Sequence, residues 1–366
     1  MGLSCGIVGL PNVGKSTLFN ALTQSALAEA ANYPFCTIEP NKGSVPVPDA
    51  RLHALAALAQ SQQVIPAAVD FVDVAGLVKG AGEGEGLGNK FLGHIRETDA
   101  VCHVVRCFDD GDVTHVEGGV DPLRDVEIIE TELMLSDLAS TEKRVAGCEK
   151  KAKSGDKESK ALLSLLERVH AQLAAGLPAS TAERAPEEAA LFKSLGLITS
   201  KPLMYICNVS ERDVGGGNAH TAKVEALAER RGAKCVRICA KAEEEIAALD
   251  SDEEKKEFLS ALGLEEAGLA RVIRAGYGLL DLITYFTVGP KEARAWTVKS
   301  GSRAPAAAGV IHTDFEKGFI RAETIAYDDY IAGGGEKGAK EAGKLRLEGK
   351  DYVVQDGDVL HFRFNV

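Results

Sequence analysis

The stretch Gly9-Leu10-Pro11-Asn12-Val13-Gly14-Lys15-Ser16-Thr17 matches in full the Walker A pattern Gly-x-x-x-x-Gly-Lys-[Ser/Thr]. An apolar run at 5–8 precedes it and predicts a buried strand, and residues 17–23 have the pattern of the first turns of a helix. In such a strand–loop–helix unit, backbone N–H groups and the positive end of the helix point at a polyphosphate. The stretch therefore predicts a phosphate-binding loop at the centre of an α/β fold.

Each polar position of this loop has an expected role. The predicted nucleotide contacts are Asn12, Val13, Gly14, Lys15, Ser16 and Thr17. Lys15 is expected to reach the β- and γ-phosphates and to act catalytically by offsetting charge in the transition state. The Ser16 hydroxyl is a predicted Mg²⁺ ligand. The Asn12 amide oxygen, beside the phosphates, is a candidate ligand for a monovalent cation such as K⁺.

Composition restricts the classes of protein that this chain can belong to. Its 366 residues are 45% hydrophobic and 26% charged, which is ordinary for a soluble globular protein of about two to three domains. The sequence shows no apolar run of transmembrane length and no secretory leader, so we expect a cytoplasmic protein without a membrane partner. A formal net charge of −12 disfavours indiscriminate nucleic-acid binding, and sequence-specific DNA is not an expected partner.

Two segments downstream of the loop are predicted to sense the γ-phosphate. Residues 32–41 are too rich in proline for a helix, and Thr37 within them is expected to supply a second Mg²⁺ ligand when the phosphate is present. A strand at 69–74 runs into an Asp-x-x-Gly signature. Its Asp73 is predicted to hold Mg²⁺ through water, and the Gly76 N–H is predicted to bond the γ-phosphate during catalysis.

The position after Gly76 is unusual for a hydrolase of this type. Leu77 stands where many GTPases place the glutamine that orients the attacking water. A leucine cannot hydrogen-bond water, so either hydrolysis is intrinsically slow or another group orients it. His115, in a polar loop that follows a strand at 100–105, is our candidate for that group. Five alternating glycines between 80 and 88 predict a switch loop that nucleotide would order.

Residues 126–195 have a different pattern. Apolar residues recur at heptad-like steps with charges between them, which predicts a long antiparallel helical hairpin that turns at 154–156. The tip, at 150–160, is rich in lysine although the chain is acidic overall. It is therefore a candidate contact for the ribosome or ribosomal RNA, and an ordinary solvated surface is the alternative.

The α/β pattern then resumes with two strands that end in candidate base-reading loops. P-loop GTPases have Asn-Lys-x-Asp at the first of these places, whereas this chain has Asn208-Val209-Ser210-Glu211. The amide of Asn208 can pair with adenine as readily as with guanine, and Glu211 would have to place its carboxylate differently from an aspartate. ATP therefore becomes the expected nucleotide, with GTP possible. The predicted base contacts are Asn208, Val209, Glu211 and Ala240.

The last part of the chain, after a break at Gly289-Pro290, has short alternating runs that predict a small mixed sheet with one or two helices. The predicted division is a G domain at 1–125 and 199–282, a helical coiled-coil insertion at 126–198, and a C-terminal domain at 283–366.

Long segments of the chain resemble the YchF family of Obg-like ATPases. The segments that carry the resemblance are 9–17, 32–41, 73–80, 208–211, 292–297, 307–315 and 348–352, and it extends over essentially the whole chain. It implies a GTPase-type domain interrupted by an antiparallel coiled coil and followed by a β-grasp-like TGS domain. It also implies a hydrolase that prefers ATP, or accepts both ATP and GTP, and that associates with ribosomes.

The resemblance also assigns roles to single residues. It implies a hydrophobic residue in place of the catalytic glutamine, which is Leu77, and a histidine that assists hydrolysis, which is His115. It implies base contacts at Asn208 and Glu211 with the Val209 backbone close to adenine. The later base loop lacks the usual serine, which leaves the backbone of Ala240 as its contact.

Three other functions remain open at this point. The chain can be a nucleotide-binding module with negligible hydrolysis, as Leu77 allows. It can also be a guanine-specific translational GTPase, or an RNA-binding scaffold that does not depend on Lys15.

Overall fold

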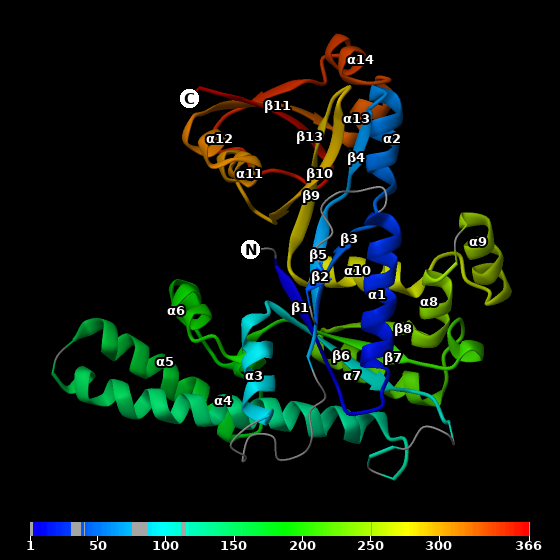
Figure 1. Cartoon of the computed structure of the whole chain (residues 1–366). Coiled ribbons are helices and arrows are strands. Elements are labelled where there is room, and N and C mark those ends of the chain that lie inside the picture. Colours follow the sequence, from blue (N-terminus) through cyan, green and yellow to red (C-terminus); the bar gives the residue numbers. More distant parts are fainter. Residues whose placement is uncertain are drawn as a thin grey trace.

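The computed structural model describes residues 3–30, 38–39, 41–74, 87–110, 115–116, 118–154, 156–249 and 251–365. Within these residues the strands form two sheets, one of seven strands and one of six. Figure 1 shows the sheet of the C-terminal region stacked above the sheet that carries the N-terminus, with a helical hairpin projecting to one side.

The first sheet is mainly parallel. From one edge to the other its strands are β2 (Ile38–Glu39), β3 (Lys42–Pro46), β5 (Ala68–Asp73), β1 (Ser4–Val8), β6 (Ala100–Arg106), β7 (Leu203–Asn208) and β8 (Lys234–Ile238). β1 pairs in parallel with β5 and β6, and β3 is antiparallel to β5. Every residue of β1 and β6 is buried, as expected of strands that are covered on both faces.

Helices cover both faces of this sheet. Tyr205 and Cys207 of β7 share a core with α7 (Ala219–Arg231), whereas Met204 and Ile206 face the core that contains α10 (Gly268–Leu279). The other helices of this part are α1 (Lys15–Ala30), α3 (Leu87–Glu97), α8 (Ala240–Ala247), α9 (Asp252–Ala261) and α10 (Gly268–Leu279). Because alternate residues of β7 are buried in cores on opposite faces, packing holds this strand in place. The predicted loop that follows its end is therefore held in place as well.

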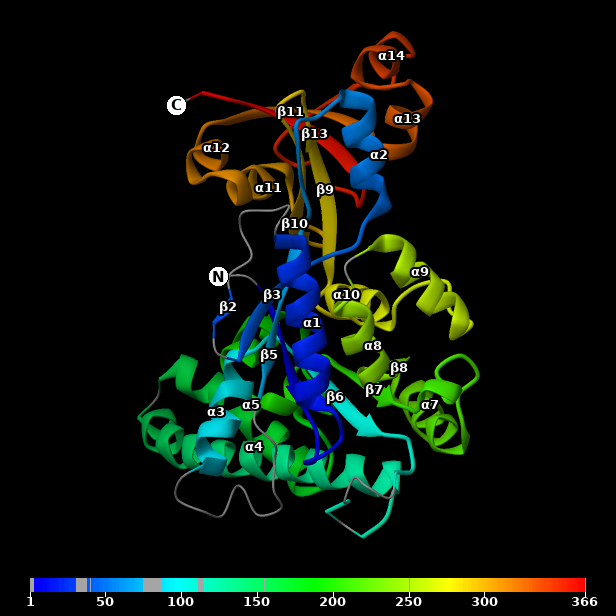
Figure 2. The same cartoon turned by 45° about the vertical axis from the view of Figure 1, so that its right-hand side comes forward.

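The predicted hairpin is present between β6 and β7. It consists of α4 (Pro122–Lys153) and α5 (Lys157–Ala174) (Figure 2), and a shorter helix, α6 (Ala189–Ser194), follows it (Figure 1). The turn falls where the sequence predicts it, and the Ser159 N–H donates to Asp156 Oδ2 at 2.9 Å to start α5. The first helix begins at Pro122, a residue type that suits the first helical turn.

The second sheet is built mostly from the C-terminal region. Its strand order is β12 (Arg346–Glu348), β11 (Phe319–Ala326), β13 (Asp358–Phe364), β9 (Leu282–Val288), β10 (Glu292–Lys299) and β4 (Gln63–Ile65). The helices around it are α2 (Ala50–Ala59), α11 (Ala304–Ile311), α12 (Thr313–Lys317), α13 (Tyr327–Ala332) and α14 (Glu336–Glu341). The predicted small mixed sheet is therefore present, but the prediction of one or two helices was wrong, because the described part of 283–366 contains four short ones, α11 to α14.

One strand of this sheet comes from a distant part of the chain. β4 pairs in parallel with β10, although its residues lie in the range predicted for the first part of the G domain. The Gln62 N–H donates to Pro290 O at 3.0 Å, and Ser61 Oγ donates to Gly289 O at 2.8 Å. The α/β fold class with its inserted hairpin and second sheet is confirmed, whereas the domain boundaries stay a prediction. No helix in the described ranges is both long and apolar enough to cross a bilayer.

Candidate nucleotide-binding site

The Walker A loop connects β1 to α1 with a backbone that few residue types can adopt. Gly14 has φ +95°, and a Cβ on it would lie 2.3 Å from Nδ2 of Asn208. Asn12 has φ +61°, in the left-handed region that asparagine tolerates better than most residues. The loop therefore depends on glycine at position 14 for both its curvature and the close approach of Asn208.

The Lys15 side chain folds back over the Walker A loop. Its Nζ donates to Leu10 O at 2.7 Å, and the residue is only 7% exposed. Burial lowers the pKa of Lys15 to about 8, and the negative charge of Asp73 partly opposes that shift. The ammonium group therefore provides a desolvated positive charge inside the loop, where a phosphate would replace the carbonyl as its partner.

Asp73 at the end of β5 faces the start of α1. Ser16 Oγ donates to Asp73 Oδ2 at 3.5 Å, while Oδ1 is buried and has no hydrogen-bond partner among the residues that the structure describes. Burial raises the pKa of Asp73, and the Lys15 charge and the Ser16 hydrogen bond lower it. A buried carboxylate oxygen without a partner, beside a hydroxyl, suits a hard cation such as Mg²⁺ or its water ligands.

The residues for such a cation are few. Among the residues that the structure describes, no group of three or more His, Cys, Asp or Glu side chains could hold a metal ion.

Asn208 connects three parts of the site. Its Nδ2 donates to Val13 O at 2.9 Å, and its Oδ1 accepts from the Ala240 N–H at 2.9 Å. The side chain thus ties the end of β7 to the Walker A loop and to the start of α8. Because the sequence indicated only a base contact, this bridging role was missed; one amide hydrogen and one lone pair remain for a purine.

The other predicted base contacts lie around this bridge. Val209 is buried, and its N–H donates to Ile238 O at 2.8 Å. Ala240 is the first residue of α8 and is also buried. Glu211 is exposed at the start of a 3-10 turn, Glu211–Asp213. Asn208 thus brings Val13 and Ala240 together, and Glu211 lies three residues further along the chain.

His115 has a partner that the sequence did not reveal. Its Nε2 lies 2.8 Å from Oδ2 of Asp125, and the two side chains are 6% and 4% exposed. Asp125 lies in the first turn of α4, and its Oδ1 also accepts from Arg124 Nη2 at 3.1 Å. The sequence analysis began the helical segment at residue 126, whereas α4 begins at Pro122, so the position of Asp125 in a first helical turn, where a carboxylate is stabilised, was missed.

Several predicted positions lie outside the described residues. These are Thr37, Gly76, Leu77 and the part of the glycine-rich segment that precedes α3. Their roles stay predictions.

Comparisons with known proteins agree with this geometry. A family model described as "50S ribosome-binding GTPase" matches residues 4–141, and the model of the YchF-GTPase C-terminal region, described as a protein of unknown function, matches residues 282–365. The chain is 60% identical over 366 residues to the ribosome-binding ATPase YchF of Haemophilus influenzae, with all of both chains covered. The chain belongs to the YchF family. The family resemblance predicted from the sequence is therefore confirmed.

Other members of the family extend the comparison. The ribosome-binding ATPase YchF of Bacillus subtilis is 55% identical over 368 residues, again with complete coverage of both chains. The solved structure of the Schizosaccharomyces pombe YchF GTPase superposes with a TM-score of 0.89 at 39% identity, and covers 99% of this chain and 98% of that one. The fold of the whole chain, including the hairpin and the second sheet, is thus that of the YchF family.

Proposed function

We propose that this chain is a cytoplasmic, Mg²⁺-dependent ATPase that also accepts GTP and acts as a nucleotide-controlled switch on the ribosome. The observation that carries the proposal is the buried Lys15, held inside a Walker A loop with Asp73 and Ser16 beside it. The full-length relatives named ribosome-binding ATPase YchF support both the reaction and the partner.

The chain's own groups account for phosphate binding. Backbone N–H groups of residues 12–17 and the N-terminus of α1 would bind the polyphosphate, and Lys15 would neutralise part of its charge. Ser16, Thr37 and Asp73 would hold Mg²⁺, whose chemistry is to neutralise charge on the phosphate oxygens. Gly76 would donate its N–H to the γ-phosphate. Asn12 is the candidate for a K⁺ ligand, and turnover that is indifferent to exchange of K⁺ for Na⁺ would contradict this role.

Water positioning is assigned to His115. A carboxylate partner fixes the tautomer and the orientation of an imidazole, and Asp125 has that relation to His115. Leu77 cannot perform this role, so the hydrolytic step would depend on the His115–Asp125 pair. Asp125 is then a positioning residue, because it acts through His115.

Base choice is assigned to the two loops that Asn208 joins. Glu211 and Val209 replace the aspartate and lysine of a guanine-specific loop, which supports ATP as the preferred nucleotide. A guanine-specific GTPase remains the second candidate, because the S. pombe relative is titled a GTPase. Calorimetric titration with ATP and GTP separates the two, and a preference for GTP above tenfold would favour the second.

Ribosome association is assigned in part to the hairpin tip. Lys150, Lys151, Lys153, Lys157 and Lys160 are all exposed at this end. A cluster of lysines on a projecting hairpin supports local contact with ribosomal RNA in a chain of negative net charge.

The decisive test is ATP turnover by the wild type and by Lys15→Ala. We expect loss of Lys15 to lower turnover by about 100-fold or more, as for other preorganised charge-stabilising groups. Equal rates would exclude the ATPase reaction. Single-turnover measurements with and without ribosomes then distinguish a slow ATPase from a module that only binds nucleotide.

A further inference from the structure

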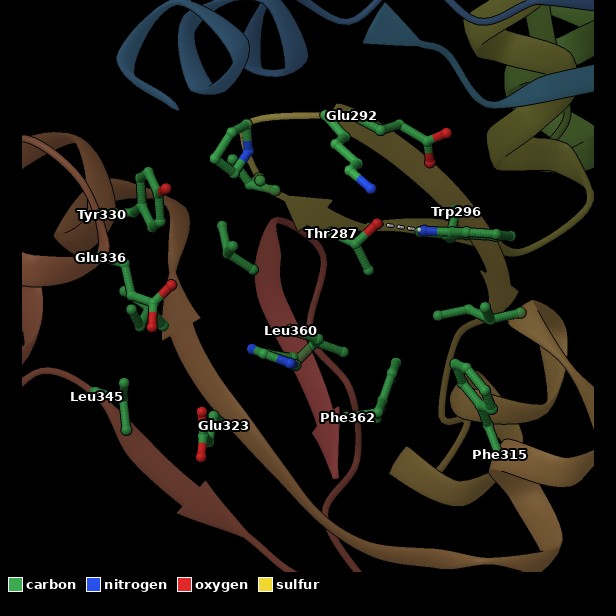
Figure 3. Close-up of a pocket in the computed structure, with 18 of the residues that line it drawn as sticks. Thr287, Glu292, Trp296, Phe315, Glu323, Tyr330, Glu336, Leu345, Leu360 and Phe362 are labelled. Atoms are coloured by element: carbon green, nitrogen blue, oxygen red, sulfur yellow. Dashed lines mark hydrogen bonds between the residues drawn. The ribbon is translucent and has the colours of Figure 1, made fainter. Parts of the chain in front are cut away.

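A cavity of about 760 Å³ opens in the second sheet, between β9 and β13. These two strands pair at a single position, Val359 with Phe286. Beyond it, β9 turns at Gly289-Pro290 into β10, whereas β13 continues beside β11 to Phe364. Figure 3 shows the gap with the β9–β10 hairpin on one side and β13 with β11 on the other. The cavity is therefore an opening within a sheet.

The opening leaves one edge of β13 without a neighbouring strand. Residues 360–364 pair with β11 on one side, and alternate backbone groups of an inner strand point to the other side. Within the described ranges, the register between the two strands contains no further pair, so residues 361–364 have no β9 residue opposite them. A row of open N–H and C=O groups beside a cavity is the arrangement that receives an added strand.

The wall formed by the β9–β10 hairpin is held in place. Trp296 Nε1 donates to Thr287 Oγ1 at 2.8 Å, which fixes the indole on the wall, and the hydrogen bonds from Ser61 and Gln62 anchor the turn at Gly289-Pro290. A site that exists before binding avoids part of the entropic cost of ordering. The opening is thus suited to an extended segment that enters as a strand.

The side chains around the opening define the chemistry of that segment. Trp296, Phe315 and Phe362 supply apolar surface. The charged lining side chains are three carboxylates, from Glu292, Glu323 and Glu336, and one lysine, Lys291. Arg363 lies 3.0 Å from Glu323 and Arg294 lies 3.9 Å from Glu292, whereas Glu336 is exposed at the start of α14. The exposed Glu336 carboxylate favours a positively charged group beside it and disfavours the phosphates of RNA.

We infer that this opening binds an extended peptide segment of a partner protein, with apolar and basic residues in alternation, by strand pairing with β13. Alternate side chains of such a strand point to opposite faces of the sheet. The apolar set meets Trp296 and its neighbours, and the basic set meets the carboxylates. The site is distinct from the nucleotide site, so the inference does not depend on hydrolysis.

The chain contains one tryptophan, Trp296, so in the folded protein all tryptophan fluorescence comes from a residue that lines this opening. The probe is a capped hexapeptide of alternating lysine and valine, titrated into the full-length protein. We expect a saturable change in fluorescence and slower amide hydrogen exchange at residues 360–364. The same peptide with glutamate in place of lysine, and one with N-methylated backbone amides, should bind at least about tenfold more weakly.

A pair of charge-reversal variants tests the location. Glu336→Lys should weaken binding of the lysine–valine peptide by about three- to tenfold, whereas Glu341→Lys, exposed on the same helix but outside the lining, should leave binding unchanged. The inference is overturned if millimolar peptide leaves the fluorescence and exchange unaltered, or if the N-methylated peptide binds equally well. It is also overturned if a uridine hexanucleotide binds in place of the peptide, or if both variants have the same effect.

Discussion

At the scale of single residues, Asn208 joins the Walker A loop to the start of α8. Asn208→Ala would remove the hydrogen bonds to Val13 O and Ala240 N–H, and would leave both buried backbone groups without a partner. We expect it to lower the free energy of unfolding by about 1–3 kcal/mol and to weaken ATP and GTP binding by similar factors. Thermal denaturation and calorimetric titration with each nucleotide measure these effects.

Glu211→Ala is the matched comparison. Glu211 is exposed and takes no part in the bridge, so its removal should change the ratio of ATP to GTP affinity and leave the melting temperature unaltered. If Asn208→Ala had normal stability but changed the ratio of ATP to GTP affinity more than tenfold, Asn208 would act mainly by recognising the base.

His115 gives a second prediction at this scale. Asp125→Asn keeps the size of the side chain but removes the charge that orients the imidazole. We expect a lower kcat for ATP with little change in KM, because the pair is assigned to water positioning and not to nucleotide binding. Steady-state kinetics at saturating ATP checks this. A raised KM with normal kcat would instead place the pair in the binding step.

At the scale of elements, Lys201 fixes the end of α3. Its Nζ donates to Ile95 O at 2.6 Å and to Arg96 O at 2.7 Å, and also to Thr98 O. A cation at the C-terminus of a helix is favourable, and three backbone carbonyls depend on this one. Lys201→Met should therefore lower the free energy of unfolding by about 1–3 kcal/mol, measured by urea denaturation at pH 7.5.

The same lysine gives a pH dependence. Burial lowers the pKa of Lys201 to about 8 in the folded chain, from 10.5. Between these values the unfolded chain binds more protons, so this group makes stability rise with pH through that window. The difference in unfolding free energy between the wild type and Lys201→Met should widen from pH 8 to pH 10. A difference that narrows over this range would contradict the assignment.

The elements differ in how well they could be predicted from the sequence. The Walker A loop, the strand that ends at Asp73 and the hairpin turn at 154–156 could be predicted, because each depends on residues close together in the chain. The pairing of β4 with β10 and the bridge from Asn208 to Val13 join residues about 200 positions apart or more, and no local pattern encodes them. The role proposed for Asp125 could not be predicted for the same reason, because its contact with His115 exists only in the folded chain.

At the scale of the whole molecule, the two sheets share one hydrophobic core. Leu18 and Leu22 of α1, Leu52 of α2, and Phe286 and Val359 of the second sheet belong to the same cluster of buried residues. Arg51 of α2 also donates to Asp356 Oδ2 at 2.7 Å. A continuous core of this kind favours cooperative unfolding of both sheets together.

ATP binding therefore should stabilise a region that it does not touch. Trp296 reports unfolding of the second sheet, whereas the phosphate loop lies in the first. If the sheets unfold as one unit, ATP at 100 times its Kd should raise the unfolding free energy seen by Trp296 by about 2.7 kcal/mol, the same as that seen by far-ultraviolet circular dichroism. Lys15→Ala is the control, because it should not bind ATP and its unfolding free energy should therefore not change when ATP is added. A Trp296 midpoint that ATP leaves unmoved, while the dichroism midpoint rises, would mean that the second sheet unfolds independently and that nucleotide occupancy is not transmitted through the shared core.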